Sequence, residues 1–162
     1  MMFEFLSSNE RDSALNYLVE RFGFSKAVFD NYDFYRTKAE IRICAKGCKE
    51  YLQKILNVCD LGYAALRYGK VTKPTTTFIQ QFGKYATKNI VQLDEAQAKA
   101  FISGKDLRLE KEVEKSKASD GYVIVKYRSD CLGLGILRGK LLLNQIPKRK
   151  RLNLIEEFKQ KD

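Results

Sequence analysis

Apolar residues recur along the chain at both helical and strand spacings, which predicts a mixture of helices and strands. Residues 9–22 place apolar side chains three and four apart and end before Gly23, as an amphipathic helix does. Residues 40–44 alternate polar and apolar side chains, as expected of a strand with one wet face, and we expect a hairpin turn at Thr37-Lys38. Further along, the spacing predicts a helix over 49–59, a strand over 61–68, a turn over 69–74 and a short helix over 78–85.

The second half of the chain predicts more strands than helices. Asp94 is placed to cap a helix over 95–103, which Gly104 closes. We expect strands over 89–93, 122–127 and 132–137, an extended piece from Leu107, an exposed loop over 111–120 and one or two helical turns over 152–158. The change of pattern near Thr87-Lys88 indicates an α+β protein with an N-terminal domain over residues 1–87 and a second domain over 88–162.

Positive charge is concentrated in two bands, and the net charge is +10. No acidic residue lies between Asp130 and Glu156, a stretch that carries Arg138, Lys140, Lys148, Arg149, Lys150 and Arg151. Another acid-free stretch, from Asp60 to Asp94, carries Arg67, Lys70, Lys73, Lys84 and Lys88. If the bands meet in space, they form the electropositive surface that binds a phosphate backbone; two separate solvated faces are the alternative.

The type of each side chain suggests its role toward RNA. Arginine can fork two N–H donors onto one phosphate, whereas lysine acts as a flexible point charge. Asn144 and Gln145 suit either a base edge or a turn, and Lys73 with its neighbour Lys70 suits either solvent or a second phosphate contact. Tyr122 and Tyr127 suit the core better than base stacking. The predicted RNA-binding residues are Lys70, Lys73, Arg138, Lys140, Asn144, Lys148, Arg149, Lys150 and Arg151.

Catalytic, metal and cofactor sites find little support in the sequence. The chain has no histidine, so Ser-His and Cys-His pairs are excluded. Cys44 and Cys48 have no matching second pair, and we expect the four cysteines to be free thiols that pack as small hydrophobes. We therefore expect a protein that is not an enzyme and needs no cofactor or metal, although a carboxylate-only mechanism stays open. Without a signal segment or a long apolar run, the chain is expected to be cytoplasmic and to have no membrane partner.

The order of elements in the second half resembles the PUA domain, a small RNA-binding barrel. The resemblance is carried by a strand, a short helix that ends in residues 101–105, the strand 122–127 and the glycine-bearing strand 132–136. It implies a PUA pseudo-β-barrel in which Gly133 and Gly135 let another backbone approach. Because no helix follows these glycines, a dinucleotide-binding loop is disfavoured.

Upstream, Leu61-Gly62, residues 69–73, Phe78 and residues 86–104 are similar to the Nip-seven family of ribosome-biogenesis factors from eukaryotes and archaea. The tail over 143–151 is more similar to the PUA-like module of Sun-type ribosomal RNA cytosine-5 methyltransferases. These resemblances imply RNA binding, most directly to ribosomal RNA during large-subunit maturation, with the N-terminal domain holding a protein partner or extending the RNA surface. The alternatives are an adaptor for a separate rRNA- or tRNA-modifying enzyme and a modifying enzyme in its own right.

Overall fold

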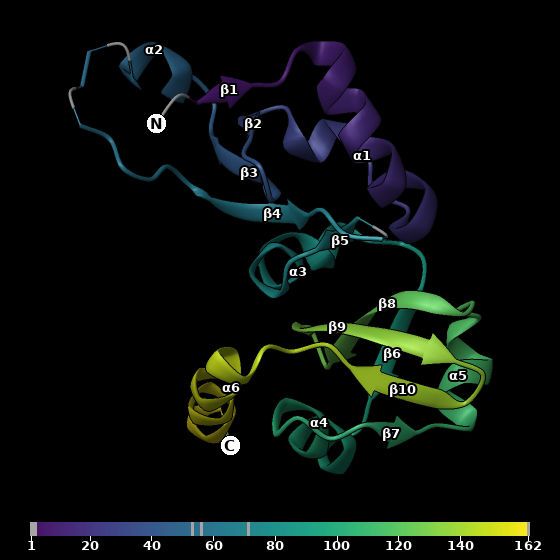
Figure 1. Ribbon diagram of the computed structural model, residues 1–162. Coiled ribbons are helices and arrows are strands. Elements are labelled where there is room, and N and C mark those ends of the chain that lie inside the picture. Colours follow the sequence, from purple (N-terminus) through teal and green to yellow (C-terminus); the bar gives the residue numbers. More distant parts are fainter. Residues whose placement is uncertain (1–2, 53, 56, 71, 162) are drawn as a thin grey trace.

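A computed structural model describes residues 3–52, 54–55, 57–70 and 72–161. Two five-stranded sheets, one from each half of the chain, lie at opposite ends of the molecule, and helix α3 lies between them (Figure 1). The first sheet ends at Pro74 and the second begins at Ile90. The protein is therefore of the α+β class, with both sheets largely antiparallel.

The first sheet has the order β1-β2-β3-β4-β5, and every neighbouring pair is antiparallel. Pro74, which has no N–H to donate, lies in the short edge strand β5, where a missing donor is tolerated. The strands are β1 (Glu4–Phe5), β2 (Tyr32–Arg36), β3 (Glu40–Ala45), β4 (Tyr63–Arg67) and β5 (Lys73–Pro74). The helices of this half are α1 (Ser8–Phe22), η1 (Lys26–Phe29), α2 (Cys48–Leu52), α3 (Thr76–Phe82) and η2 (Gly83–Tyr85).

The predicted N-terminal helix and the hairpin after it are confirmed. Ser7 and Glu10 form a capping box at the start of α1, and Gly23 ends the helix with a φ of 67° that glycine adopts without strain. The helix expected over 49–59 is wrong in its length: α2 ends at Leu52, and residues 57–60 are not helical. Residues 53 and 56 of that prediction lie outside the described residues.

The second sheet has the order β6-β8-β9-β10-β7 and curls into a half-barrel (Figure 1). The β6–β8 pair is parallel, and the remaining pairs are antiparallel. Its strands are β6 (Ile90–Leu93), β7 (Leu107–Arg108), β8 (Gly121–Tyr127), β9 (Asp130–Arg138) and β10 (Leu141–Asn144). Its helices are α4 (Glu95–Ile102), α5 (Lys111–Ser116) and α6 (Lys148–Gln160).

Three sequence expectations for this half need correction. Residues 111–116 form helix α5 rather than a loop, β10 was not anticipated, and the C-terminal helix begins at Lys148 instead of residue 152. The glycines of β9 also act differently from the expectation: a Cβ on Gly135 would lie 2.5 Å from Leu142 Cδ1, and one on Gly133 would lie 3.0 Å from Ile146 Cγ1. Side chains, rather than a second backbone, therefore occupy the space that the glycines leave.

The two halves share a hydrophobic core. Ile124 and Leu134, which belong to the second sheet, are buried in the same cluster as Phe78, Ile79 and other residues of α1 and α3. A second cluster fills the interior of the half-barrel beneath α4 and α6. Because buried apolar area resists separation, this shared core fixes the two sheets relative to each other and so fixes the surfaces between them.

Candidate nucleic-acid interface

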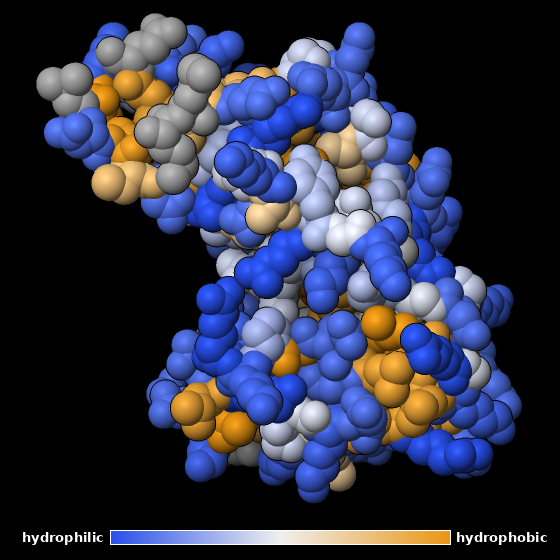
Figure 2. All heavy atoms as spheres, in the orientation of Figure 1, coloured by the Kyte–Doolittle hydropathy of each residue, from blue (hydrophilic) through white to orange (hydrophobic). Residues whose placement is uncertain are grey.

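A cleft of about 660 Å³ lies between strands β3–β4 and the first turns of α6. Its lining joins Glu40 and Arg42 from the first sheet to Arg149, Lys150 and Asn153 from the C-terminal helix. Figure 2 shows the molecule narrowing between its two halves, with hydrophilic side chains on both sides of the constriction. The size falls within the range of about 300–1,000 Å³ that is typical of ligand pockets.

A smaller space of about 50 Å³, here called the neck, lies next to β5 and shares Arg67, Arg149 and Lys150 with the lining of the cleft. The cations of this neck are Arg67, Lys73, Arg149 and Lys150, and none of the described residues that line it is acidic. Residues from both basic bands of the sequence therefore meet here, as expected for a surface that neutralises phosphates. Among the predicted RNA-binding residues, the structure brings together Lys73, Arg149 and Lys150.

The position of Arg149 and Lys150 follows from the two-sided pattern of α6. Leu154 is buried against the half-barrel, and Ile155 and Phe158 pack on the same core, where the Phe158 ring lies 5.1 Å from that of Tyr127. Residues on the other side of the helix therefore face the cleft and solvent. Lys148 is exposed at the start of the helix and lies beyond the described lining of the cleft.

Two of the predicted RNA-binding residues have partners inside the protein. Asn144 donates from Nδ2 to the Phe101 carbonyl oxygen at 2.5 Å, and its Oδ1 accepts from Ile146 N at 2.9 Å. Arg151 donates from Nε to the Ile146 carbonyl oxygen at 3.2 Å, and its guanidinium lies over Gly104. The sequence allowed Asn144 either a contact to a base edge or a role in a turn, and these bonds give it the role in the turn. Arg151 holds the start of α6 against the end of α4.

The remaining predicted residues do not join the cleft. Arg138 and Lys140 are exposed in the β9–β10 turn, at the opposite end of β10 from α6 (Figure 1). There Leu141 lies between Arg138 on β9 and Arg108 on β7, and 43% of its surface is exposed. Lys70 lies in the exposed turn between β4 and β5. The sequence suggested that the two basic bands form one continuous surface. In the structure they meet around the neck, and the other predicted cations lie apart from it.

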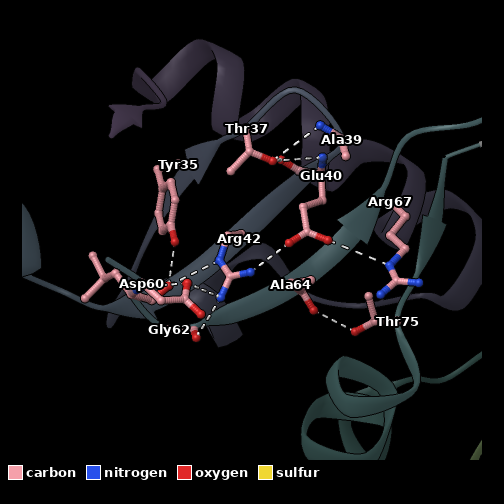
Figure 3. A network of polar contacts seen from close by, with 11 residues as sticks. Tyr35, Thr37, Ala39, Glu40, Arg42, Asp60, Gly62, Ala64, Arg67 and Thr75 are labelled. Carbon is pink, nitrogen blue, oxygen red and sulfur yellow. Dashed lines mark hydrogen bonds and ion pairs between the residues drawn. The ribbon is translucent and has the colours of Figure 1, made fainter. Parts of the chain in front are cut away.

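A network of charged side chains forms the β3–β4 wall of the cleft (Figure 3). Arg42 Nη1 lies 2.7 Å from Glu40 Oε1, and Arg42 Nη2 lies 2.7 Å from Asp60 Oδ1. The same guanidinium donates to the carbonyl oxygens of Leu61 and Gly62. Burial opposes the charge of Arg42, but the hydrogen bond to Glu40 and the nearby Tyr35 and Asp60 raise the pKa of its guanidinium above the ordinary value, so it stays charged.

Sequence reasoning did not assign this network to the site. Glu40 and Arg42 lie on the wet face of the strand that the alternation predicted, but the alternation does not say what that face meets. Asp60 and Gly62 reach Arg42 from the segment that precedes β4, which is nearly 20 residues away in sequence. Only the folded sheet shows that these groups and α6 enclose one space.

Two general findings bear on the site. Within the described part of the chain, no group of three or more Cys, Asp or Glu side chains is arranged to hold a metal ion. Across the same residues, no helix combines the length and the apolar character needed to cross a membrane.

Comparisons with known proteins concern mainly the second half. Residues 88–152 match the family described as the methyltransferase RsmF PUA domain. The chain is 36% identical over 67 residues to the ribosomal RNA small subunit methyltransferase F of Aeromonas salmonicida (strain A449). That match takes in 41% of this chain and 13% of the length of the methyltransferase.

A solved structure resembles almost the whole chain. It is described as a conserved PUA domain protein from Thermoplasma acidophilum, with a TM-score of 0.57 over 97% of this chain and 99% of that protein. At 14% identity, this similarity concerns the fold alone. Residues 88–152 are therefore similar to the PUA domain of RsmF-type ribosomal RNA methyltransferases, and the chain as a whole has a fold similar to that of the Thermoplasma PUA protein.

Proposed function

We propose that this protein binds RNA in the cleft between its two halves and takes part in ribosomal RNA maturation without being an enzyme itself. The observation that carries the proposal is the neck, where Arg67 and Lys73 of the first half lie with Arg149 and Lys150 of α6 and no described lining residue is acidic. The PUA domain suggests RNA binding, and its similarity to rRNA methyltransferase PUA domains supports ribosomal RNA as the partner. A role in large-subunit biogenesis in the cytoplasm belongs to the same proposal.

Salt dependence of binding tests the neck directly. Each phosphate contact that a cation makes to a single strand contributes about 0.7 to the slope of log affinity against log salt concentration. The double variant Arg149→Ala/Lys150→Ala is therefore expected to lower the slope by about 1.4 and to weaken binding at low salt. Fluorescence anisotropy with a labelled single-stranded rRNA fragment measures both quantities.

The matched control is Arg138→Ala/Lys140→Ala, which removes the same charge from the opposite end of the half-barrel. We expect its salt slope to stay close to that of the unmodified protein. Equal losses in both double variants would show that net charge, rather than the neck, determines binding, and would refute the proposed site.

One observation favours a second candidate function. The match to the ribosomal RNA methyltransferase takes in 13% of that protein's length, and residues 88–152 match the RsmF PUA domain. This is consistent with an adaptor that supplies an RNA-binding module to a separate modifying enzyme. Such an adaptor would bind that enzyme tightly with RNA present and weakly after nuclease treatment, whereas the main proposal predicts RNA binding by the protein alone.

A further inference from the structure

The two walls of the cleft differ in charge and in rigidity. On the β3–β4 wall, the side chains of Glu40 and Arg42 are only 18% and 15% exposed and are paired with each other. On the α6 wall, Arg149 is exposed and Lys150 is half-buried. None of the described residues that line the neck with them is acidic. The site is therefore a cationic strip beside a fixed array in which positive and negative groups alternate.

This asymmetry sets the direction in which a nucleotide can lie. A phosphate is attracted to the neck and repelled by the carboxylates of Glu40 and Asp60, which line only the larger part of the cleft. A base carries no net charge and can approach a carboxylate with its N–H donors. The backbone therefore belongs on the α6 side and the base on the β3–β4 side.

The geometry around Glu40 leaves capacity for a further donor. Oε1 accepts from Arg42 Nη1 at 2.7 Å, whereas Oε2 forms a longer ion pair with Arg67, 3.7 Å from its Nε and beyond hydrogen-bond distance. A carboxylate offers about four acceptor sites, so both oxygens can accept again. The backbone N–H of Glu40 is held by Thr37 Oγ1 at 3.2 Å, which helps to fix the residue at the cleft wall (Figure 3).

We propose that the cleft binds one unpaired nucleotide and prefers guanine, whose Watson–Crick edge donates to the Glu40 carboxylate. Guanine presents two adjacent donors on that edge, N1–H and the 2-amino group, which one carboxylate can accept in parallel. Adenine and cytosine present one amino donor and uracil one imino donor. In a duplex this edge is already paired, so the nucleotide comes from a single strand. The inference rests on RNA binding in the cleft and adds its base preference.

Short oligonucleotides with a single changed base test the preference. The probes are labelled uracil-only nonamers and the same strands with guanine, inosine or adenine at the centre. A parallel pair of hydrogen bonds discriminates between bases, so the guanine strand is expected to bind about tenfold more tightly than the uracil strand. Inosine, which lacks the 2-amino group, should fall between them, and a hairpin in which the guanine is paired should lose the advantage.

The variants Glu40→Gln and Asp60→Asn form a matched pair, since each removes one negative charge that contacts the Arg42 guanidinium. We expect Glu40→Gln to abolish the guanine preference, because an amide has one acceptor oxygen and cannot accept both guanine donors in parallel, and Asp60→Asn to keep the preference. Circular dichroism and thermal unfolding check that both variants are folded. The comparison of strands on the unmodified protein needs no variant, and equal affinity for the guanine and uracil strands would overturn the inference.

The result also separates this inference from the proposed function. One outcome is that Arg149→Ala/Lys150→Ala weakens the binding of every strand, while the unmodified protein binds the guanine and uracil strands with equal affinity. In that case the cleft binds RNA and only the base preference is wrong. If that double variant binds every strand as the unmodified protein does, the cleft is not the RNA site and both proposals fail.

Discussion

Arg21 at the end of α1 joins the two halves of the protein, and its replacement by lysine should loosen them. Its guanidinium donates to the Tyr122 carbonyl oxygen and to both the hydroxyl and the carbonyl oxygen of Ser119, each at 2.7 Å. Its own carbonyl oxygen accepts from Asn89 Nδ2 at 2.6 Å. Lysine keeps the charge but cannot reproduce the three-pronged geometry.

The expected loss follows from the number of bonds. A hydrogen bond from a charged donor contributes about 1.5–3 kcal/mol when buried, and partial exposure of Arg21 places its bonds at the low end. Lysine can keep one of the three, so Arg21→Lys should lower the free energy of unfolding by about 2–3 kcal/mol. With a slope of about 2 kcal/mol/M in urea, the midpoint falls by roughly 1 M.

Urea unfolding followed by far-ultraviolet circular dichroism measures this midpoint. Arg138→Lys is the control, because the same substitution at an exposed turn is expected to stay within about 0.5 kcal/mol. A midpoint for Arg21→Lys that matches this control would show that the bonds across the two halves do not stabilise the fold, and the reasoning would be refuted.

Three further predictions concern packing and titration. Gly135→Ala places a Cβ 2.5 Å from Leu142 Cδ1, so overpacking should lower the thermal midpoint by an amount that corresponds to about 1–3 kcal/mol. Burial raises the pKa of the Cys44 thiol to about 12, so at pH 8 mass spectrometry should find Cys59, which is exposed, alkylated well before Cys44. Burial also raises the pKa of Tyr17 to about 12, from about 10 in the unfolded chain. The stability contributed by the protonated Tyr17 hydroxyl is therefore complete below about pH 10 and is lost as the pH rises toward 12. In an alkaline titration, a Tyr17→Phe variant should unfold at a higher pH than the unmodified protein.

Elements with strong local signals could be predicted from the sequence. Asp94 caps α4 through a capping box with Gln97, and the turn between β8 and β9 separates a run of β-branched and aromatic residues from a run rich in leucine and glycine. In such segments the capping residues, the turn residues and the apolar runs that determine the structure are neighbours in sequence. Their boundaries were accordingly within a few residues of those observed.

Elements that depend on distant contacts could not be predicted. Helix α5 is highly charged, but Val113 packs on the second core and Glu112 accepts from Gln97 Nε2 at 3.0 Å, so tertiary contacts favour the helix. The candidate site shows the same limit. Charge along the chain identified Lys73 and Arg138 equally well, whereas only the folded sheet shows that the first reaches the neck and the second lies at the far end of the half-barrel.

The first turn of α6 breaks a rule of helix electrostatics, and this supports the proposal that Arg149 and Lys150 bind phosphate. Pro147 precedes four consecutive cations, Lys148 to Arg151, with no acid among them. The N-terminal end of a helix carries partial positive charge, so each cation there costs about 0.3–1 kcal/mol at low ionic strength. Natural sequences break such local rules mainly at functional sites. A phosphate bound in the neck, beside Arg149 and Lys150, would offset the repulsion between these cations and the positive end of the helix. The electrostatic cost would then be present in the free protein and absent from the complex with RNA.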